Sequence, residues 1–269
     1  MADPRLIQAV DDLIRRHARP DHVPLIAIAG AQGSGKSTLA AEAATRLSCA
    51  VLSLDDVYLT RAGRADLAAR VHPLFAVRGP PGTHDLDLLD QTLARLRAAG
   101  PGDRTAIPAF DKLADDRRPR TDWPIFEGRP RAVLLEGWCL GATPQGPAEL
   151  SESINDLERI DDPDAVWRRA INHSLATRYV RLFATFDALL FLKAPTFDRI
   201  LDWRVEQEAG LLGIRPAAVP EARRTELARF IQAFERITRH MLAGGVTADS
   251  VIELDEDRAV LHIRDHGGA

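Results

Sequence analysis

The sequence predicts an α/β fold with a mostly parallel central sheet and helices on both of its faces. Short apolar runs alternate along the chain with longer segments in which apolar residues recur at helical spacing. Such runs suit strands that are buried on both sides, as in parallel βαβ units. Ligands of these sheets bind beyond the carboxyl ends of the strands. The chemistry is therefore expected just after residues 29, 54, 135 and 192.

Four apolar runs are expected to form the strands of the central sheet. Each is short and ends in a glycine, an acid or a proline, which suits a buried strand more than a helix. In chain order they are PLIAIAG (24–30), AVLSLD (50–55), RAVLLEG (131–137) and DALLFLKAP (187–195). A shorter strand is a candidate at TAIPAF (105–110), and residues 251–264 suit a closing hairpin around the turn DED.

The segments between these strands supply the helices and two long loops. Apolar residues at helical spacing predict helices, and a glycine closes one of them. The expected helices cover residues 4–17, 36–48, 85–100, 167–186, 197–213 and 220–242. Two stretches rich in Gly, Pro and Arg, 59–84 and 110–130, are expected to be loops that hold an acceptor. Long loops inside a compact domain are often functional.

Length and composition bound the possible functions. The 269 residues suit one domain (1–269), with an N-terminal helix in 1–20 and a helical lid region in 196–243. The net charge of −4 argues against a nucleic-acid partner, which usually selects a basic surface. The start of the chain lacks a secretory pattern, and no apolar stretch reaches the ~20 residues that cross a bilayer. A cytoplasmic enzyme without a membrane partner is expected, and Cys49 and Cys139 are expected to be buried thiols.

Residues 30–38, GAQGSGKST, match the nucleotide-binding pattern G-x-x-x-x-G-K-[ST]. Its glycines let the backbone curl so that successive N–H groups point at phosphate oxygens, and the following helix presents its positive end to the same anion. Lys36 is expected to reach the β- and γ-phosphates of ATP, and Ser37 to ligate Mg²⁺. A chance Gly-rich turn is the alternative, but the strand before the loop and the helix after it favour the nucleotide site. The candidate binding residues are Gly30, Ala31, Gln32, Gly33, Ser34, Gly35, Lys36, Ser37 and Thr38.

Carboxylates stand at the ends of the second and third predicted strands. Asp55 and Asp56 follow the second strand, and Glu136 follows the third. Phosphoryl transfer to a hydroxyl needs one carboxylate to accept the proton and another to hold Mg²⁺. We assign Asp55 as the base and place Ser37, Asp55 and Glu136 on the metal side. Asp56 and Tyr58 are candidates for acceptor contacts, with a loop-capping role as the alternative for Asp56.

The two loops carry further candidates for the acceptor site. RGPPGTHDL offers Arg78 and His84, and its Asp85 either joins them or caps the following helix. IPAFDKLADDRRPRTDW offers Asp111 and Lys112, followed by several arginines. A basic cluster in a net acidic chain suits an anionic acceptor or phosphates. A solvated surface loop is the alternative.

The C-terminal third suits a lid that closes over the phosphates. Kinases of this general type bring an arginine to the transferring group by such a closure. Arg204, in WRVEQE, is the first candidate, whereas most other arginines here suit solvated helix faces. Lysine occurs only at Lys36, Lys112 and Lys193 in this arginine-rich chain. Because the two side chains are not interchangeable, a lysine inside a motif is itself a sign of function.

With these motifs assembled, the chain resembles the D-glycerate 3-kinase and kinase-like family of phosphate-loop kinases from about residue 24 to 258. It is similar more distantly to uridine kinase, phosphoribulokinase and bacterial pantothenate kinase. The resemblance is carried by the ordered motifs GAQGSGKST, LSLDDVYLT, RGPPGTHDL, IPAFDK, LLEGWCLG, INDLE…WRRAIN and APTFDRILDWRVEQE. One departure is Val57, where the family's D-D-[FY]-Y run has an aromatic residue.

The resemblance implies a three-layer α/β/α fold of the P-loop NTPase type and an ATP- and Mg²⁺-dependent transfer to the 3-hydroxyl of D-glycerate, a small acidic acceptor. It implies that Asp55 is the base and Glu136 the Walker-type acid after the third strand. In this group the GTHD and FDK segments flank the acceptor pocket, which implies His84, Asp111 and Lys112 as acceptor-site residues.

Other functions remain open from the sequence. A kinase of the same fold could act on pantothenate, a nucleoside or a sugar acid, although the basic loop favours an acid over a nucleoside. A partner-regulated ATPase or switch is the rival from another class, but the sequence has no N-K-x-D motif of the kind that GTPase switches carry. The negative charge and few aromatic residues disfavour a nucleic-acid-linked kinase. The oligomeric state is not determined by the sequence.

Overall fold

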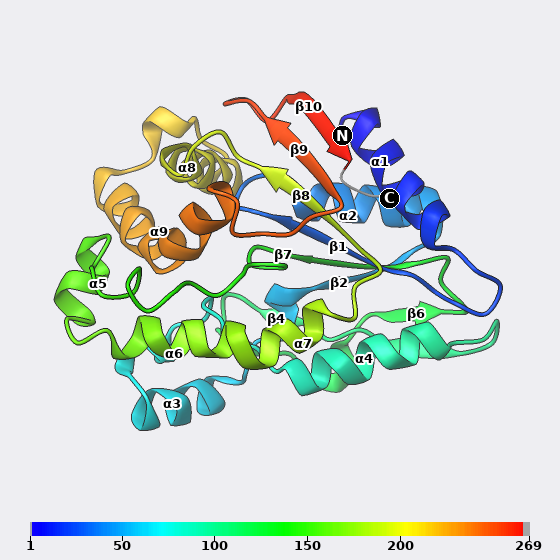
Figure 1. The fold of residues 1–269 in the computed structure, drawn as a ribbon, viewed down its shortest axis with the longest axis horizontal. Helices are drawn as coiled ribbons and strands as arrows, with labels where there is room; N and C mark the ends of the chain where they lie inside the picture. The colour runs from blue at the N-terminus through cyan, green and yellow to red at the C-terminus, as the bar shows by residue number, and fades with distance from the viewer. Residues whose placement is uncertain (1, 266–269) are drawn as a thin grey trace.

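The computed structural model describes residues 2–265 and has a six-stranded sheet at its centre (Figure 1). The spatial order is β10-β9-β8-β1-β7-β2, in which neighbouring strands are parallel except β10, which runs antiparallel to β9. The strands are β1 (Leu25–Gly30), β2 (Ala50–Ser53), β7 (Val133–Gly137), β8 (Ala188–Lys193), β9 (Ser250–Leu254) and β10 (Val260–Asp265). The four predicted strands and the closing hairpin are confirmed.

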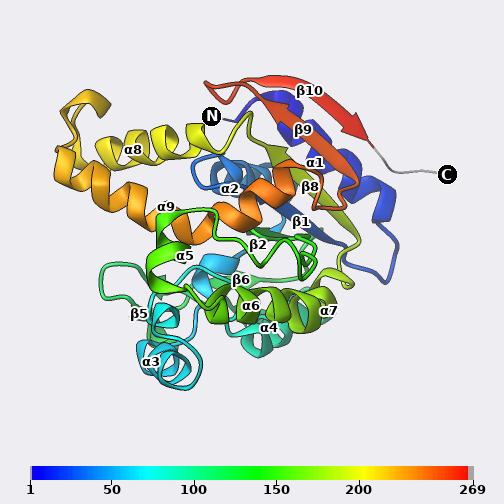
Figure 2. The ribbon, with the colours of Figure 1, turned by 60° about the vertical axis from the view of Figure 1, so that its left-hand side comes forward.

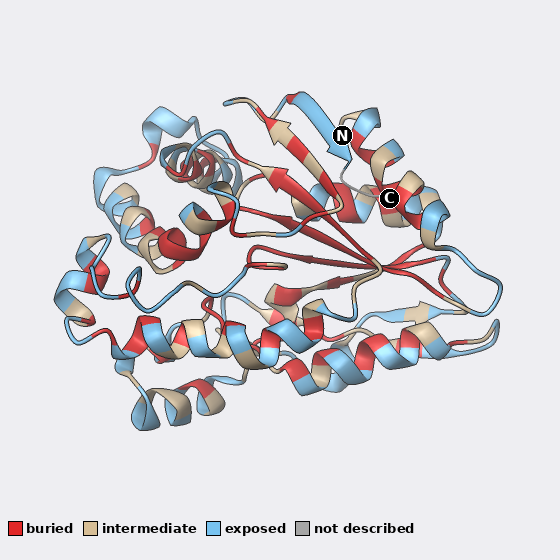
Figure 3. Cartoon of the chain, in the orientation of Figure 1, coloured by how far each residue is buried: buried red, intermediate tan, exposed pale blue. Residues whose placement is uncertain are grey.

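Helices cover both faces of the sheet, which confirms the predicted three-layer α/β/α architecture (Figure 1). Helices α1 (Pro4–His17) and α2 (Lys36–Leu47) lie on one face, and α4 (Leu86–Ala98), α6 (Val166–Ser174) and α7 (Val180–Phe183) lie on the other. Successive residues of a strand point to opposite faces. In β1, Ile26 and Ile28 enter the core under α1 and α2, whereas Ala27 and Ala29 enter the other core. Figure 3 shows the central strands β1, β7 and β8 buried along their length, whereas β10 at the edge of the sheet is mostly exposed.

The expected lid region consists of two long helices, α8 (Asp198–Leu212) and α9 (Glu221–Leu242), which lie side by side (Figure 2). A buried ion pair fastens α9 to the short helix α5 (Asp156–Asp161): Arg236 donates to both carboxylate oxygens of Glu158 at 2.7 and 2.6 Å. The same guanidinium donates to the carbonyls of Glu149 and Glu152. The C-terminal end of α9 is therefore anchored to the body of the protein.

The stretch 59–84 was expected to be a loop, and this expectation is wrong in part. It contains helix α3 (Arg61–Arg70) and a 3-10 turn at Pro73–Ala76. Helix α3 shows no apolar stripe because its RAGRADLAAR sequence holds a single large apolar residue. The helix is held by fully buried Arg64, which donates to the carbonyls of Leu59, Ala76 and Asp115.

Two other segments differ in part from the sequence prediction. The candidate strand at 105–110 is confirmed in part: β3 (Arg104–Ala106) pairs with β6 (Ile125–Glu127), and β4 (Phe110–Asp111) pairs with β5 (Asp116–Arg117), both outside the central sheet. The predicted helix over 167–186 is interrupted by a π-helical turn at Leu175–Tyr179. Such turns are rare and have no sequence signature in hydrophobic spacing.

Both cysteines are buried free thiols, as predicted. Burial raises the pKa of the Cys49 thiol to about 11 and that of Cys139 above its ordinary range as well. Neither thiol is therefore ionised near neutral pH.

Within residues 2–265, no helix is long and apolar enough to cross a membrane.

We expect Arg236→Ala to lower the free energy of unfolding by about 3–5 kcal/mol, because it leaves the buried carboxylate of Glu158 unpaired. Urea unfolding followed by circular dichroism measures the change. Arg239→Ala is the matched control, since its partners Glu235 and Asp198 lie in more exposed pairs of the same helix. Equal losses in the two variants would show that the Arg236 pair does not anchor the helix.

Candidate active site

The phosphate loop connects β1 to α2 at the carboxyl end of the sheet. Gly35 is the N-cap of α2 in the left-handed region (φ +89°), and no side chain caps the first turn. The first N–H groups of the helix are therefore available to an anion. Gly33 also has positive φ (+77°), and a Cβ placed there would lie 2.7 Å from Cβ of Trp203. Only glycine lets α8 approach the loop this closely.

Two hydrogen bond donors next to the loop are buried without a partner. They are the Ser34 hydroxyl and Nε of Arg204, and the acceptor Oε1 of Gln32 is also unpaired. Burial lowers the pKa of Arg204 below its ordinary value, although a guanidinium stays protonated in proteins. Buried donors without partners are rare and call for an explanation. An anion bound on the loop supplies one for Arg204, which lines the pocket beside the loop, whereas Ser34 is not among the lining residues.

Glu136 joins the phosphate loop to the neighbouring strand β2. Its Oε1 accepts hydrogen bonds from the hydroxyls of Ser37 at 3.0 Å and Ser53 at 2.6 Å, and its Oε2 lies 4.0 Å from Nζ of Lys36. A hydroxyl and a carboxylate are hard oxygen ligands, which suit Mg²⁺. Residues 2–265 contain no cluster of three or more His, Cys, Asp or Glu side chains that could hold a metal. The set fits Mg²⁺, which is usually held by one or two protein oxygens together with substrate phosphates and water.

Asp55 lies in a 3-10 turn (Leu54–Asp56) directly after β2 and, together with the phosphate loop, lines a pocket. Its Oδ1 accepts a hydrogen bond from the Tyr58 hydroxyl at 2.6 Å, and its Oδ2 lies 3.7 Å from Nζ of Lys112. Burial alone raises the pKa of Asp55, but the charges of Lys112 and Lys36 and the bond from Tyr58 outweigh it. The pKa of Asp55 is therefore below its ordinary value, and the carboxylate is ionised at neutral pH. It can accept a proton through the oxygen that Tyr58 leaves free.

His84 stands behind Asp55 and not among the residues that line the pocket. It is 4% exposed, and its ring stacks on Tyr58 with the centroids 4.6 Å apart. Its Nδ1 lies 2.5 Å from the Tyr179 hydroxyl, which also accepts a bond from the Gly82 N–H. Burial lowers the pKa of His84 to about 4, so the ring is neutral. This geometry places His84 in support of Tyr58, away from the space an acceptor could fill.

The other acceptor candidates are brought near the site, but their side chains are engaged elsewhere. Arg78 pairs with Asp115 and stacks on Phe110 at 5.7 Å. Asp111 accepts two backbone hydrogen bonds within its own turn. Asp56 accepts the Phe110 N–H at 3.3 Å, and burial raises the pKa of Asp56. These three are absent from the pocket lining, in contrast to Lys112.

Asp85, for which the sequence left two roles open, is structural. Its side chain accepts the N–H of Leu88 as the N-cap of α4, and it pairs with Arg117 at 2.8 Å. Arg117 also donates to the carbonyl of Tyr58. Arg117 thereby connects the basic 110–130 segment to the turn that carries Asp55. Its side chain has a structural role and does not bind an anion directly.

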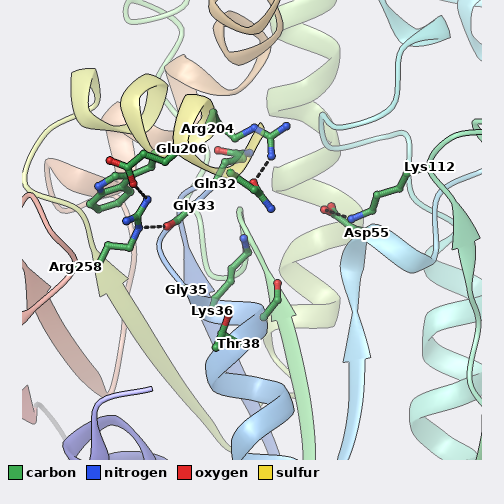
Figure 4. A pocket seen from close by; sticks show the side chains of 13 residues that line it. Gln32, Gly33, Gly35, Lys36, Thr38, Asp55, Lys112, Arg204, Glu206 and Arg258 are labelled. Atoms are coloured by element: carbon green, nitrogen blue, oxygen red, sulfur yellow. Dashed lines mark hydrogen bonds and ion pairs between the residues drawn. The ribbon is translucent and has the colours of Figure 1, made fainter. Parts of the chain in front are cut away.

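A pocket of about 450 Å³ unites the phosphate loop, Asp55, Lys112 and the lid helix (Figure 4). Sequence reasoning missed four of its residues: Trp203, Glu206 and Gln207 on α8, and Arg258 in the turn between β9 and β10. Gln207 could have been inferred from Arg204, because residues three apart lie on the same face of a helix. Trp203 lies three and four positions before Glu206 and Gln207 and so shares a face with them. Arg258 had no such signal, since it meets the phosphate loop across 225 positions of the chain.

The arrangement combines an anion cradle with an ionised carboxylate. Free N–H groups, Lys36 and Arg204 suit a polyphosphate, and Ser37 with Glu136 suits its metal ion. Asp55 suits the removal of a proton from a group beside Lys112. Phosphoryl transfer needs these parts, because positioning and charge placement do most of its catalysis.

The chain is similar in sequence to proteins that are described as kinases. A protein of Schizosaccharomyces pombe described as "Uncharacterized kinase mug58" is 31% identical over 220 residues, which cover 77% of this chain and 78% of that protein. The chloroplastic D-glycerate 3-kinase of Arabidopsis thaliana is 28% identical over 258 residues, covering 88% of this chain. The match spans only 54% of the plant enzyme's length. No protein-family model matches the chain.

The fold has solved relatives as well. The structure of D-glycerate 3-kinase from Cryptococcus neoformans var. grubii superposes with a TM-score of 0.76 and covers 97% of this chain and 99% of that chain. The two sequences are 22% identical, so this likeness concerns the fold alone. It confirms the predicted phosphate-loop kinase architecture.

We expect Tyr58→Phe to raise the pKa of Asp55, because the variant removes a hydrogen bond that favours the ionised carboxylate. Carbon-13 NMR titration of the labelled aspartate side chains measures the shift. Tyr179→Phe is the control: it removes a hydroxyl that contacts His84 and not Asp55. An unchanged pKa in Tyr58→Phe, or the same shift in both variants, would contradict the direct role of Tyr58.

Proposed function

The chain belongs to the family of phosphate-loop kinases that includes D-glycerate 3-kinase, and we propose that it transfers the γ-phosphate of ATP to the 3-hydroxyl of D-glycerate. As a member of this family it is an ATP-dependent phosphotransferase that acts on an alcohol group. The position of Lys112 is the observation that favours a small acid as the acceptor. Its exposed ammonium group lies beside the ionised base candidate and lines the pocket.

The proposed binding mode of ATP follows the phosphate loop. The uncapped N-terminus of α2 would bind the phosphates, and Lys36 would contact the β- and γ-phosphates. Ser37 and Glu136 would hold Mg²⁺, which neutralises charge on the phosphate oxygens when bound. Arg204 would donate its unpaired Nε to the phosphates from the lid. Closing the lid would exclude water, which otherwise competes as an acceptor.

The proposed transfer uses Asp55 as general base. The acceptor hydroxyl oxygen attacks the γ-phosphorus while its proton passes to a carboxylate oxygen of Asp55. One phosphorus–oxygen bond forms, and the bond between the γ-phosphorus and the bridging oxygen breaks, so that ADP leaves with that electron pair. Tyr58 keeps Asp55 in place because it is itself buried between His84 and the protein core.

A small acid fits the charges at the acceptor end. Lys112 Nζ is 3.7 Å from Asp55 Oδ2, so a carboxylate bound to the ammonium would hold a nearby hydroxyl close to the base. A three-carbon hydroxy acid has this short separation between carboxylate and hydroxyl. A nucleoside has no anionic group to offer Lys112. The same reasoning allows another short hydroxy acid as the acceptor, and the assay below distinguishes them.

The proposal is tested by measuring ADP release from Mg-ATP with and without D-glycerate, with the product identified by phosphorus-31 NMR. Release that depends on D-glycerate and gives 3-phosphoglycerate is the expected result. A response to another hydroxy acid but not to D-glycerate would replace the acceptor and keep the mechanism. Steady release without any acceptor would instead indicate a partner-regulated ATPase and overturn the proposal.

Asp55→Asn is expected to lower kcat by at least ~10²-fold, the scale of a lost general base. The amide keeps the size of the side chain but cannot accept the proton. Steady-state kinetics with a coupled ADP assay measure the change, and binding of Mg-ATP measured in parallel checks that the site is intact. Near-full turnover in this variant would remove Asp55 from the role of base.

Lys112→Ala is expected to raise the KM for the acceptor roughly tenfold or more with a small change in the KM for ATP, as for a lost charge-assisted hydrogen bond. Arg120→Ala removes one positive charge from the same segment without touching the pocket, and it controls for long-range electrostatics. If both variants raise the acceptor KM equally, Lys112 makes no direct contact with the acceptor.

A further inference from the structure

Arg258 is held by two other parts of the chain, the phosphate loop and helix α8. It lies in the turn between β9 and β10, where its φ of +67° is in the left-handed region. Its Nε donates to the carbonyl of Gly33 at 2.7 Å, and its Nη2 donates to Glu206 at 2.6 Å. The centre of its guanidinium lies 4.9 Å from the ring centroid of Trp203. A non-glycine residue keeps such a backbone only where its surroundings fix it.

These contacts hold the guanidinium in place beside the indole of Trp203 and leave part of the side chain exposed. Trp203 is completely buried, and its indole N–H is occupied by the carbonyl of Glu256. The Arg258 side chain is 31% exposed and lines the pocket. Arg258 thus packs over the indole and also forms part of the pocket wall. A flat, immobile cation of this kind is suited to stack on a planar ring.

The position of Arg258 along the pocket indicates which part of a bound ligand could stack on it. Figure 4 shows Arg258 and Glu206 at one end and Asp55 and Lys112 at the other, with Lys36 between them. The γ-phosphate must lie next to the attacking hydroxyl, and hence at the Asp55 end. The phosphates occupy the loop around Lys36. The nucleoside end of the donor is therefore directed to Arg258.

We propose that Arg258 is the platform on which the nucleobase of ATP stacks, with Trp203 as the buried support behind it. This inference rests on the proposed ATP binding mode and adds a residue from the C-terminal hairpin to the nucleotide site. Arg258 also joins Gly33 of the phosphate loop to Glu206 of the lid helix. A nucleobase that stacks on Arg258 would thus place ATP against a residue that already connects the phosphate loop and the lid helix.

The test compares two ligands that share a triphosphate but differ in the base. Isothermal titration calorimetry measures the binding of Mg-ATP and of Mg-tripolyphosphate to wild-type protein, Arg258→Ala and Arg258→Lys. We expect both substitutions to weaken Mg-ATP roughly tenfold, the scale of a lost stacking contact with a guanidinium. Binding of Mg-tripolyphosphate should change less than twofold. Arg264→Ala is the matched control, because this arginine of β10 is exposed and pairs with Glu253.

Each outcome of the titrations either supports or contradicts the stacking of the nucleobase on Arg258. Equal weakening of both ligands would show that Arg258 only shapes the phosphate loop through Gly33, and would overturn the platform. Unchanged binding of Mg-ATP would overturn it as well. If Arg258→Ala fails to fold, Arg258→Lys supplies the comparison, since it keeps a donor for Gly33 and loses the plane. Failure of the wild-type protein to bind Mg-ATP at all would count against the proposed function instead.

Discussion

The parallel register of β2, β7 and β1 is the constraint on which the site depends. It pairs Ser53 with Glu136 and Glu136 with Ile28, so that the carboxyl ends of three strands open side by side. Glu136 then reaches the hydroxyls of Ser37 and Ser53 at the same time. A shift of the register by one residue would turn Glu136 to the opposite face of the sheet. The phosphate loop would then lose its carboxylate partner.

The charges around the pocket give each titratable group the protonation state that its proposed role requires. Asp55 is partly buried, which opposes ionisation, but Lys112, Lys36 and the Tyr58 hydroxyl compensate. Behind it, His84 is neutral because it is buried, so it adds no charge to the site. Arg204 remains incompletely paired on the lid. The free protein thus holds cations in excess near the loop, which favours the binding of a polyphosphate.

Local sequence predicted the elements well where a strong pattern exists. The buried strands are apolar on both faces and end in a glycine, an acid or a proline, and the phosphate loop has its own spacing. The pattern failed where tertiary contacts replace hydrophobic periodicity. Helix α3 has only one large apolar residue and depends on Arg64, whose partners lie in three other segments. The π-helical turn that aims Tyr179 at His84 leaves no trace in the sequence for the same reason.

The sequence by itself determined the fold class, the phosphate loop, and the positions of Asp55 and Glu136, because strand ends beside such a loop converge at one edge of a parallel sheet. Only the tertiary structure decided which acceptor candidates line the pocket. Lys112 does, whereas His84, Arg78 and Asp111 are occupied by Tyr179, Asp115 and their own turn. It also brought Arg258 to Gly33 across 225 positions. Side-chain pairing over such separations depends on the packed fold, and local spacing carries no information about it.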